Sequence, residues 1–193
     1  MHAEYLGLNI LIIDDDEDDY FITSEYIRSI PGNRYVIDWC YKYEDALKLT
    51  CDTKYDLFLV DYLLGAKTGL DLIKESISKN CEQPFILLTG KGNRKVDVEA
   101  MEAGAFDYLV KSEMDSEKLE RCIRYTYERS RSLKSLRANE RKFRNVFERS
   151  ADAVFITDGA MKFLDVNDAT VNLFGFTREE LLMSDLFSLL LGG

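Results

Sequence analysis

The sequence predicts an α/β protein built on a doubly wound parallel sheet, and two observations support this fold class. Four short runs of consecutive apolar residues occur within residues 10–110, and a weaker fifth run lies between the first and the second. Apolarity without alternation is typical of strands whose sheet is covered by helices on both faces. Helical patterns separate the runs, so strand and helix alternate five times within about 120 residues, as expected for a parallel sheet.

The expected elements follow in chain order. The apolar runs predict strands over Ile10–Ile13, Tyr35–Cys40, Leu57–Val60, Phe85–Leu88 and Phe106–Val110. Helical spacing predicts helices over Glu17–Ile30, Tyr43–Thr50, Thr68–Ser78 and Arg94–Ala103. Pro31, Gly32 and Gly104 interrupt the helical patterns and mark helix ends. We expect these elements to form one domain over residues 1–120.

A long helix is expected after this domain, because residues 117–149 contain neither glycine nor proline. Apolar residues recur there at roughly helical spacing, although Ser130, Arg137 and Glu140 interrupt them. This pattern predicts a linker helix over 117–149 that forms a short parallel coiled coil and so mediates a homodimer. The recurring positions are Leu119, Ile123, Thr126, Leu133, Leu136, Phe143, Val146 and Phe147.

Residues 150–193 begin a different pattern and are expected to form part of a second, α+β domain. Two predicted strands, Val154–Thr157 and Met161–Leu164, are joined by a turn at Asp158 and Gly159. Two short helices are predicted after them, over Asn167–Phe174 and Arg178–Leu182.

The charge is distributed unevenly over the same three segments. The formal net charge is −10, with roughly −12 in residues 1–120, roughly +7 in 121–149 and roughly −5 in 150–193. The acidic total argues against nucleic-acid binding by the protein as a whole. For the basic segment we favour a solvated helix face, and contact with nucleic acid or an anionic membrane is the alternative.

Cysteine usage and the N-terminal sequence favour a cytoplasmic protein. Cys40, Cys51, Cys81 and Cys122 show no paired spacing, which predicts scattered thiols in a reducing compartment rather than a disulfide or metal framework. The first 13 residues lack the basic region of a signal peptide. No apolar run approaches the length that spans a membrane.

Polar side chains directly follow the predicted strands. Asp14 and Asp15 follow the first strand, and Asp61, Thr89 and Lys111 each follow a later one. The carboxyl ends of parallel strands meet at one edge of an open sheet, where ligands bind. Three carboxylates at this edge repel one another, and a hard cation with oxygen ligands relieves the repulsion. The set therefore predicts a Mg²⁺ site.

The same residues fit phosphoryl transfer. A carboxylate such as that of Asp61 attacks phosphorus once its charge is balanced. The metal would neutralise one phosphoryl oxygen, Lys111 a second and Thr89 a third. Taken singly, each residue has an ordinary explanation as a cap, a loop hydroxyl or a surface lysine, and residues 16–19 fit the acidic first turn of a helix. Their joint occurrence at four strand ends favours a site.

These residues resemble the response-regulator receiver family over about Asn9–Arg124. The family's acidic pair, phospho-acceptor, hydroxyl residue and lysine correspond to Asp14-Asp15, to Asp61 in Val60–Leu64, to Thr89 before Gly90, and to Lys111. The resemblance implies a CheY-like sheet with strand order 2-1-3-4-5. It also implies phosphorylation by a histidine kinase or a phosphotransfer protein, with Asp61 catalysing its own phosphorylation and slow dephosphorylation rather than acting as a conventional enzyme.

The resemblance also implies roles for individual residues. Asp15, Asp61 and the backbone carbonyl of Leu63 would bind Mg²⁺ directly, and Asp14 would act through water. Tyr108 corresponds to the aromatic residue whose rotamer follows Thr89 on phosphorylation. The sequence departs from the family in two places. Ser112 stands where many members have proline, so we expect a trans bond there. Gly65 replaces another frequent proline, so we expect a looser loop.

The final segment resembles the first half of a PAS sensory domain. The matching stretches are Phe143–Asp158, Val166–Ala169 and Leu173–Leu181. This segment contains no histidine or cysteine that could hold haem or a flavin adduct. We expect a truncated domain with an unpaired sheet edge, followed by an output that the sequence does not reveal.

The leading hypothesis is therefore a two-component response regulator that passes the phosphorylation state of Asp61 along the helix to an output. One alternative is a haloacid-dehalogenase-like phosphohydrolase with Asp14 and Asp16 as its two aspartates, although Glu17-Asp18 do not fit its motif and Asp61 would then have no role. A second alternative is a pseudo-receiver that binds partners without phosphorylation. His2, in a tail expected to fray, is a poor internal phosphodonor.

Overall fold

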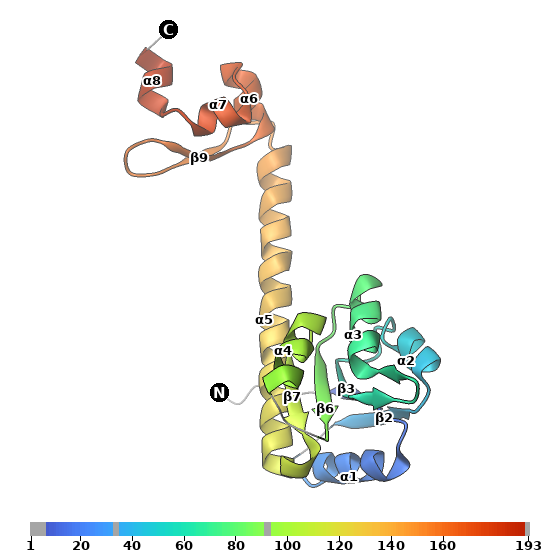
Figure 1. The fold of residues 1–193 in the computed structure, drawn as a ribbon. Coiled ribbons are helices and arrows are strands. Elements are labelled where there is room, and N and C mark those ends of the chain that lie inside the picture. The colour runs from blue at the N-terminus through green and yellow to red at the C-terminus, as the bar shows by residue number, and fades with distance from the viewer. Residues whose placement is uncertain (1–6, 33–34, 91–93, 192–193) are drawn as a thin grey trace. The chain divides into compact units, whose positions relative to one another are not determined.

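The computed structural model describes residues 7–32, 35–90 and 94–191. The chain forms two compact units, Met1–Ser132 and Leu133–Gly193, which are described separately below. Figure 1 shows the elements of each unit.

The first unit is built on a five-stranded, fully parallel sheet with strand order β2-β1-β3-β6-β7. This confirms the predicted fold class and the strand order that the family resemblance implies. The strands are β1 (Asn9–Ile13), β2 (Val36–Cys40), β3 (Leu57–Asp61), β6 (Phe85–Thr89) and β7 (Asp107–Val110).

Helices follow the strands and begin and end close to the predicted positions. They are α1 (Glu17–Arg28), α2 (Tyr43–Leu49), α3 (Gly69–Ser78), α4 (Arg94–Ala103), the 3₁₀ helix η1 (Lys111–Glu113) and α5 (Ser116–Arg149). Local capping fixes two of the starts. Asp16 accepts hydrogen bonds from the first turn of α1, and Thr68 forms a capping box with Asp71 at α3.

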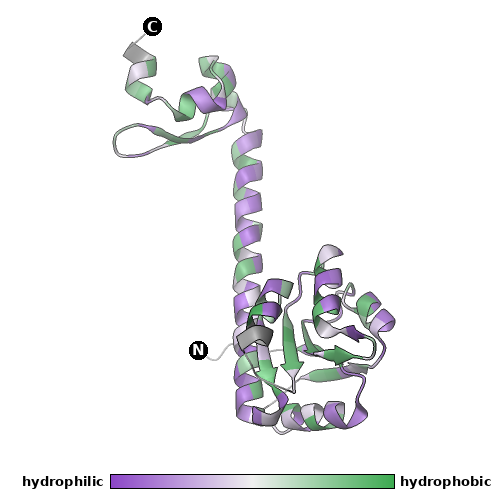
Figure 2. Cartoon of the chain, viewed as in Figure 1, coloured by the Kyte–Doolittle hydropathy of each residue, from purple (hydrophilic) through white to green (hydrophobic). Residues whose placement is uncertain are grey.

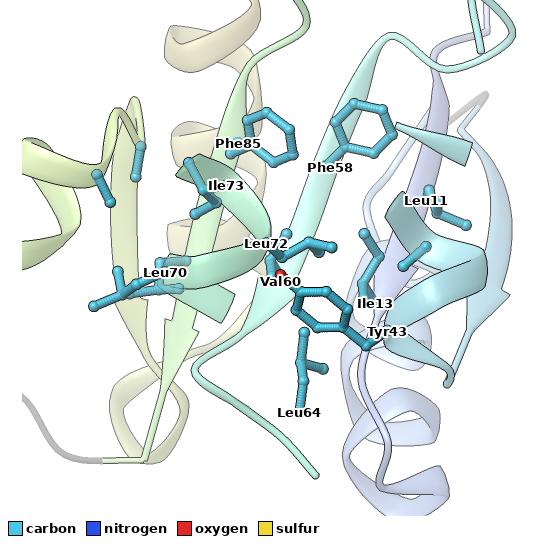
Figure 3. Close-up of a cluster of buried hydrophobic side chains, with 14 of the residues drawn as sticks. Leu11, Ile13, Tyr43, Phe58, Val60, Leu64, Leu70, Leu72, Ile73 and Phe85 are labelled. Carbon is cyan, nitrogen blue, oxygen red and sulfur yellow. The ribbon is translucent and has the colours of Figure 1, made fainter. Parts of the chain in front are cut away.

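The sheet is covered on both faces, which explains why its strands lack alternation. Side chains on one face, such as Leu11 and Val60, pack against α2, α3 and α4. Figure 3 shows Tyr43 of α2 and Leu72 of α3 among the side chains of this cluster. Residues that alternate with them, such as Ile12, face α1 and α5 on the other side. Each strand therefore buries both sets of side chains, as the apolar runs predicted.

A small hairpin after β3 was not predicted, because its strands are too short to show a period. It pairs β4 (Leu63–Leu64) with β5 (Lys67–Thr68) in antiparallel register. Gly65 in its turn adopts a left-handed backbone with φ of 63°, a conformation that glycine reaches without strain. The described residues contain no cis peptide bond, so Lys111–Ser112 is trans as expected.

The helix α5 changes its environment along its length. Leu119, Cys122 and Ile123 are buried in the core of the first unit. Further along, Leu136 and Phe143 are at least half exposed. Figure 2 shows this later stretch as mainly hydrophilic, with hydrophobic positions interspersed. The first part of the predicted apolar seam therefore belongs to the core of this unit.

The second unit pairs β8 (Phe155–Thr157) with β9 (Phe163–Val166) in antiparallel register, and α6 (Asp168–Phe174), α7 (Arg178–Leu182) and α8 (Leu186–Leu191) follow. The second strand begins two residues later than predicted. Asp158 accepts hydrogen bonds from the backbone of Ala160 and Lys162, and Met161 adopts a left-handed backbone. The turn is therefore longer than the two residues expected from the sequence.

Asn167, which is fully buried, joins the parts of the second unit. Its amide donates to the backbone carbonyls of Phe147 in α5 and of Asp152. Its side-chain oxygen accepts from the backbone of Val154 and from Thr170. One side chain thus links the end of α5 to the strand pair and to α6.

Candidate functional site

The predicted site residues lie at one edge of the sheet. Asp14 directly follows β1, Asp61 is the last residue of β3, and Thr89 is the last residue of β6. Lys111 begins the 3₁₀ helix directly after β7. Because β1, β3, β6 and β7 are parallel neighbours, these residues share the carboxyl edge, where ligands bind in open α/β sheets.

The ammonium group of Lys111 lies among three carboxylates. Its Nζ is 2.5 Å from Asp61 Oδ1, 2.9 Å from Asp14 Oδ2 and 2.6 Å from Asp19 Oδ2. Asp14 and Asp61 are buried, whereas Asp19 is partly exposed. Negative charge is thus concentrated at this edge of the sheet, largely shielded from solvent, and the ammonium group of Lys111 lies against it.

The protonation equilibria of these groups reflect burial and mutual charge. Burial raises the pKa of Asp14 from 3.8 to about 6, and the charge of Asp61 adds to this, while Lys111 opposes it. Burial also raises the pKa of Asp61 against the opposing effect of Lys111. For Lys111 itself burial acts to lower the pKa, but hydrogen bonds to the three carboxylates outweigh burial and raise it. The site therefore favours an additional positive charge near the carboxylates.

Backbone contacts fix the position of Asp61. Its Oδ2 accepts a hydrogen bond of 2.7 Å from the backbone N–H of Leu63. Gly69, at the start of α3, lies against the end of β3 so closely that a Cβ there would be 2.1 Å from the carbonyl oxygen of Asp61. Only glycine allows α3 to begin at this distance from the strand.

The two adjacent aspartates point to different partners. Asp14 Oδ1 accepts from the backbone of Asp16, and its Oδ2 contacts Lys111. Asp15 Oδ2 accepts from the backbone of Gly65 in the small hairpin, at 2.9 Å. Oxygen atoms of Asp14, Asp19 and Asp61 lie within 4.8 Å of one another. Such clustered carboxylate oxygens are the donors that a hard cation like Mg²⁺ prefers, so the residues present fit this metal.

Sequence comparison decides the family. A model of the family described as "Response regulator receiver domain" matches residues 10–124, more than half of the chain. The chain belongs to the response regulator receiver family. A second model, described as "PAS domain", matches residues 141–192, so the receiver is followed by a PAS segment in agreement with the resemblance noted above.

Curated relatives of this receiver include transcriptional regulatory proteins. ZraR of Salmonella typhimurium is 30% identical over 171 residues, which are 87% of this chain and 37% of ZraR. PhoP of Pseudomonas aeruginosa, a two-component response regulator, is 34% identical over 95 residues, which are 49% of this chain and 42% of PhoP. The chain thus spans well under half the length of these relatives.

Solved structures resemble the receiver in fold. A signal receiver domain of an HD domain-containing protein from Pseudomonas fluorescens has a TM-score of 0.60 at 21% identity, covering 70% of this chain and 97% of that one. A CheY-like receiver domain protein from Methanospirillum hungatei has a TM-score of 0.55 at 22% identity, covering 65% of this chain and 97% of that one.

None of the helices in the described part of this chain has the length and apolarity needed to cross a membrane.

One receiver residue in the cluster was missed from the sequence. Asp19 was attributed to the acidic first turn of a helix, yet its carboxylate contacts Lys111. The available signal was its position on α1, five residues after Asp14 and at the same edge of the sheet. Thr89 and Tyr108 were expected to change conformation on phosphorylation. Thr89 is buried at the end of β6, and Tyr108 is partly buried and packs against the hydrophobic cluster on the face covered by α2, α3 and α4.

Proposed function

We propose that this receiver accepts a phosphoryl group on Asp61 in a Mg²⁺-dependent reaction, with a histidine kinase or a phosphotransfer protein as donor. The observation that supports this most directly is the buried Asp61 carboxylate held 2.5 Å from Lys111 beside Asp14. A neutral side chain at this position would stabilise the fold better than a buried carboxylate that lies among other carboxylates. A functional role therefore explains Asp61 better than a structural one.

Each residue has a defined part in the transfer. A carboxylate oxygen of Asp61 forms a bond to phosphorus while the bond from phosphorus to the donor atom breaks, giving an aspartyl phosphate and the free donor. Mg²⁺, bound by Asp15, Asp61 and the Leu63 carbonyl with Asp14 acting through water, would neutralise phosphoryl charge. Lys111 balances the charge on a second phosphoryl oxygen. The Thr89 hydroxyl donates to a third, and Tyr108 follows the movement of Thr89.

Chemical phosphorylation tests this function. Incubation of the full chain with acetyl phosphate and Mg²⁺ should label the protein. The label should be lost in hydroxylamine, since an acyl phosphate is cleaved by this nucleophile and a phosphoserine is not. Chelation of the metal should prevent labelling. An unlabelled protein that still binds its partners would support the pseudo-receiver instead.

Mg²⁺ should stabilise the protein against heat, because an ion that binds only the folded site raises the melting temperature by mass action. The shift measured at about 5 mM Mg²⁺ should shrink in Asp15→Asn. Asp18→Asn is a matched control, since Asp18 is also exposed, lies in the first turn of α1 and belongs neither to the proposed ligands nor to the cluster of Asp14, Asp19 and Asp61. If Asp19→Asn removes the shift while Asp15→Asn retains it, the ligands are instead Asp14, Asp19 and Asp61.

The affinity for Mg²⁺ should fall in mild acid. Asp14 has a pKa of about 6 in the folded protein, above its usual 3.8, so it is protonated below pH 6 and no longer attracts the metal. The apparent dissociation constant should rise up to about tenfold per pH unit below this value. In the metal-free protein, the stability contributed by Asp14 changes with pH in the opposite direction. Folding disfavours ionisation of Asp14, so this contribution declines as pH rises from about 4 to 6. Mg²⁺ titrations at pH 5 and 7.5 measure the first effect, and Asp14→Asn should abolish it.

We further propose that α5 carries the signal between a receiver over about residues 1–120 and a PAS segment over 150–193, and that it pairs with a second copy of the chain. Leu133, Leu136, Phe143 and Val146 are exposed on α5. They recur at spacings of three and seven residues, which place them on one side of a helix. The residues that pair would therefore be 133–146, since those up to 130 pack within the receiver.

Self-association through α5 should strengthen as salt is added. The basic segment repels its copy in a parallel pair, and this repulsion is screened within about 10 Å at 0.1 M ionic strength. Nucleic-acid binding by the same arginines would instead weaken in salt. Sedimentation at about 50 mM and about 500 mM NaCl, with and without DNA, separates the two.

Leu136→Glu should abolish this association, whereas Ser135→Glu introduces the same charge at a neighbouring exposed position and should not. A wild-type chain that stays monomeric at both salt concentrations contradicts the pairing, and α5 then serves as a spacer.

A further inference from the structure

Trp39 on β2 is joined to the acidic site by a hydrogen bond. Its indole N–H donates to the backbone carbonyl of Asp14 at 2.9 Å. It is the only tryptophan of the chain. β2 is an edge strand of the sheet and contributes none of the residues discussed as ligands. The motif of acidic, hydroxyl and lysine residues does not include this position.

The hydrogen bond fixes the peptide that precedes Asp15. The backbone N–H of Asp14 donates to the carbonyl of Cys40 at 3.2 Å, and the carbonyl of Asp14 accepts from Trp39. Residues of β2 thus hold both the backbone N–H and the backbone carbonyl of Asp14, which lies one residue beyond the end of β1. The plane of the peptide between Asp14 and Asp15 sets the directions of their side chains, one toward Lys111 and the other toward Gly65.

The same indole also touches α1. The rings of Trp39 and Tyr20 are stacked, with centroids 4.6 Å apart and planes inclined by 7°. Tyr20 directly follows Asp19, whose carboxylate contacts Lys111. The ring of Tyr41 has its centroid 5.5 Å from that of the indole and is tilted against it by 46°. Trp39 therefore contacts the backbone of one acidic residue and the neighbour of another.

We propose that Trp39 is a positioning residue for the metal site. Its indole N–H holds Asp14 and Asp15 in the arrangement that binds Mg²⁺, and its stack on Tyr20 fixes Asp19 beside them. The inference rests on the proposed function, because it assumes that the acidic cluster takes this ion. Groups that orient the ligands of a metal govern its affinity without touching it, and their loss typically weakens binding by 10–100-fold.

The test removes the hydrogen bond and keeps the ring. Replacement of Trp39 by 3-benzothienylalanine exchanges the N–H for sulfur, so the shape and the stack on Tyr20 are retained. Calorimetric titration with Mg²⁺ should give a dissociation constant about tenfold higher than that of the wild type. Trp39→Phe, which is made by ordinary mutagenesis, should weaken binding at least as much. Tyr41→Phe keeps the indole and its bond to Asp14, and should bind as the wild type does.

A spectroscopic signature accompanies the titration. Because the indole donates a hydrogen bond to the backbone carbonyl of Asp14, its fluorescence emission should change when Mg²⁺ is added to the wild type. The Mg²⁺ concentration at the midpoint of this change should agree with the dissociation constant from calorimetry. A benzothienyl variant that binds Mg²⁺ within twofold of the wild type would overturn the positioning role while leaving the proposed function intact. A wild type that binds no Mg²⁺ would overturn both.

Discussion

Asp61→Asn is expected to reduce labelling by acetyl phosphate to background while the protein stays folded. The amide has nearly the shape of the carboxylate, and its oxygen can still accept the hydrogen bond from Leu63. It lacks the charge and the nucleophilic oxygen that the transfer needs. It also removes one of the buried negative charges around Lys111, so the melting temperature in the absence of Mg²⁺ should be equal or higher. Labelling and thermal melts on the same preparation measure both effects.

Asp14→Asn serves as the matched control, because it removes the neighbouring buried charge and leaves the proposed acceptor. It should still label, at a higher Mg²⁺ concentration than the wild type. The reverse result, with labelling retained in Asp61→Asn and lost in Asp14→Asn, would identify Asp14 as the nucleophile and favour the dehalogenase-like alternative.

Gly69→Ala is expected to destabilise the receiver by about 3 kcal/mol, the upper end of the range for overpacking. A Cβ at this position would lie 2.1 Å from the carbonyl oxygen of Asp61 and 2.9 Å from Cγ1 of Val60. The first contact is with backbone at the end of β3, which cannot rotate away. Relief therefore requires a shift of α3 or of the strand end that carries Asp61, so labelling should also slow. Urea unfolding followed by Trp39 emission measures the loss of stability.

Gly90→Ala is the control for this substitution. A Cβ on Gly90 meets nothing within 4 Å, and the residue does not adopt a left-handed backbone. Its stability should stay within about 0.5 kcal/mol of the wild type. Equal stabilities of the two alanine variants would show that α3 yields easily at its first turn.

Much of the receiver was predictable because its strands are buried on both faces. The run Leu57–Val60, for example, is apolar at every position, and the structure places it in the centre of the sheet. The residues that follow each strand could then be assigned to one edge without any knowledge of distances. Helix starts such as Glu17 were predicted equally well, because capping depends on near neighbours in the sequence.

The features that were missed depend on contacts between distant residues. Asp19 resembles any acidic residue in a first helical turn, and only its approach to Lys111, 92 positions away, distinguishes it. The linker helix shows the same limitation. One apolar pattern runs along its whole length, yet Ile123 is buried in the receiver and Val146 is 75% exposed. The helical spacing of the apolar residues could not distinguish those that pack in the receiver core from those that stay exposed and could contact another chain.

The bonding of Asn167 bears on how motion in α5 reaches the strands of the second unit. An exposed, flexible loop between a helix and a sheet would let the helix rotate without moving the strands. Here one buried amide is bonded to the last turn of the helix at Phe147 and also to Val154 and Thr170. Arg178 adds a second connection, because its Nη2 donates to both carboxylate oxygens of Glu148 in α5. Hydrogen bonds thus connect the last turn of α5 to β8, β9 and α6, and we expect a rotation of that turn to be passed on to these elements.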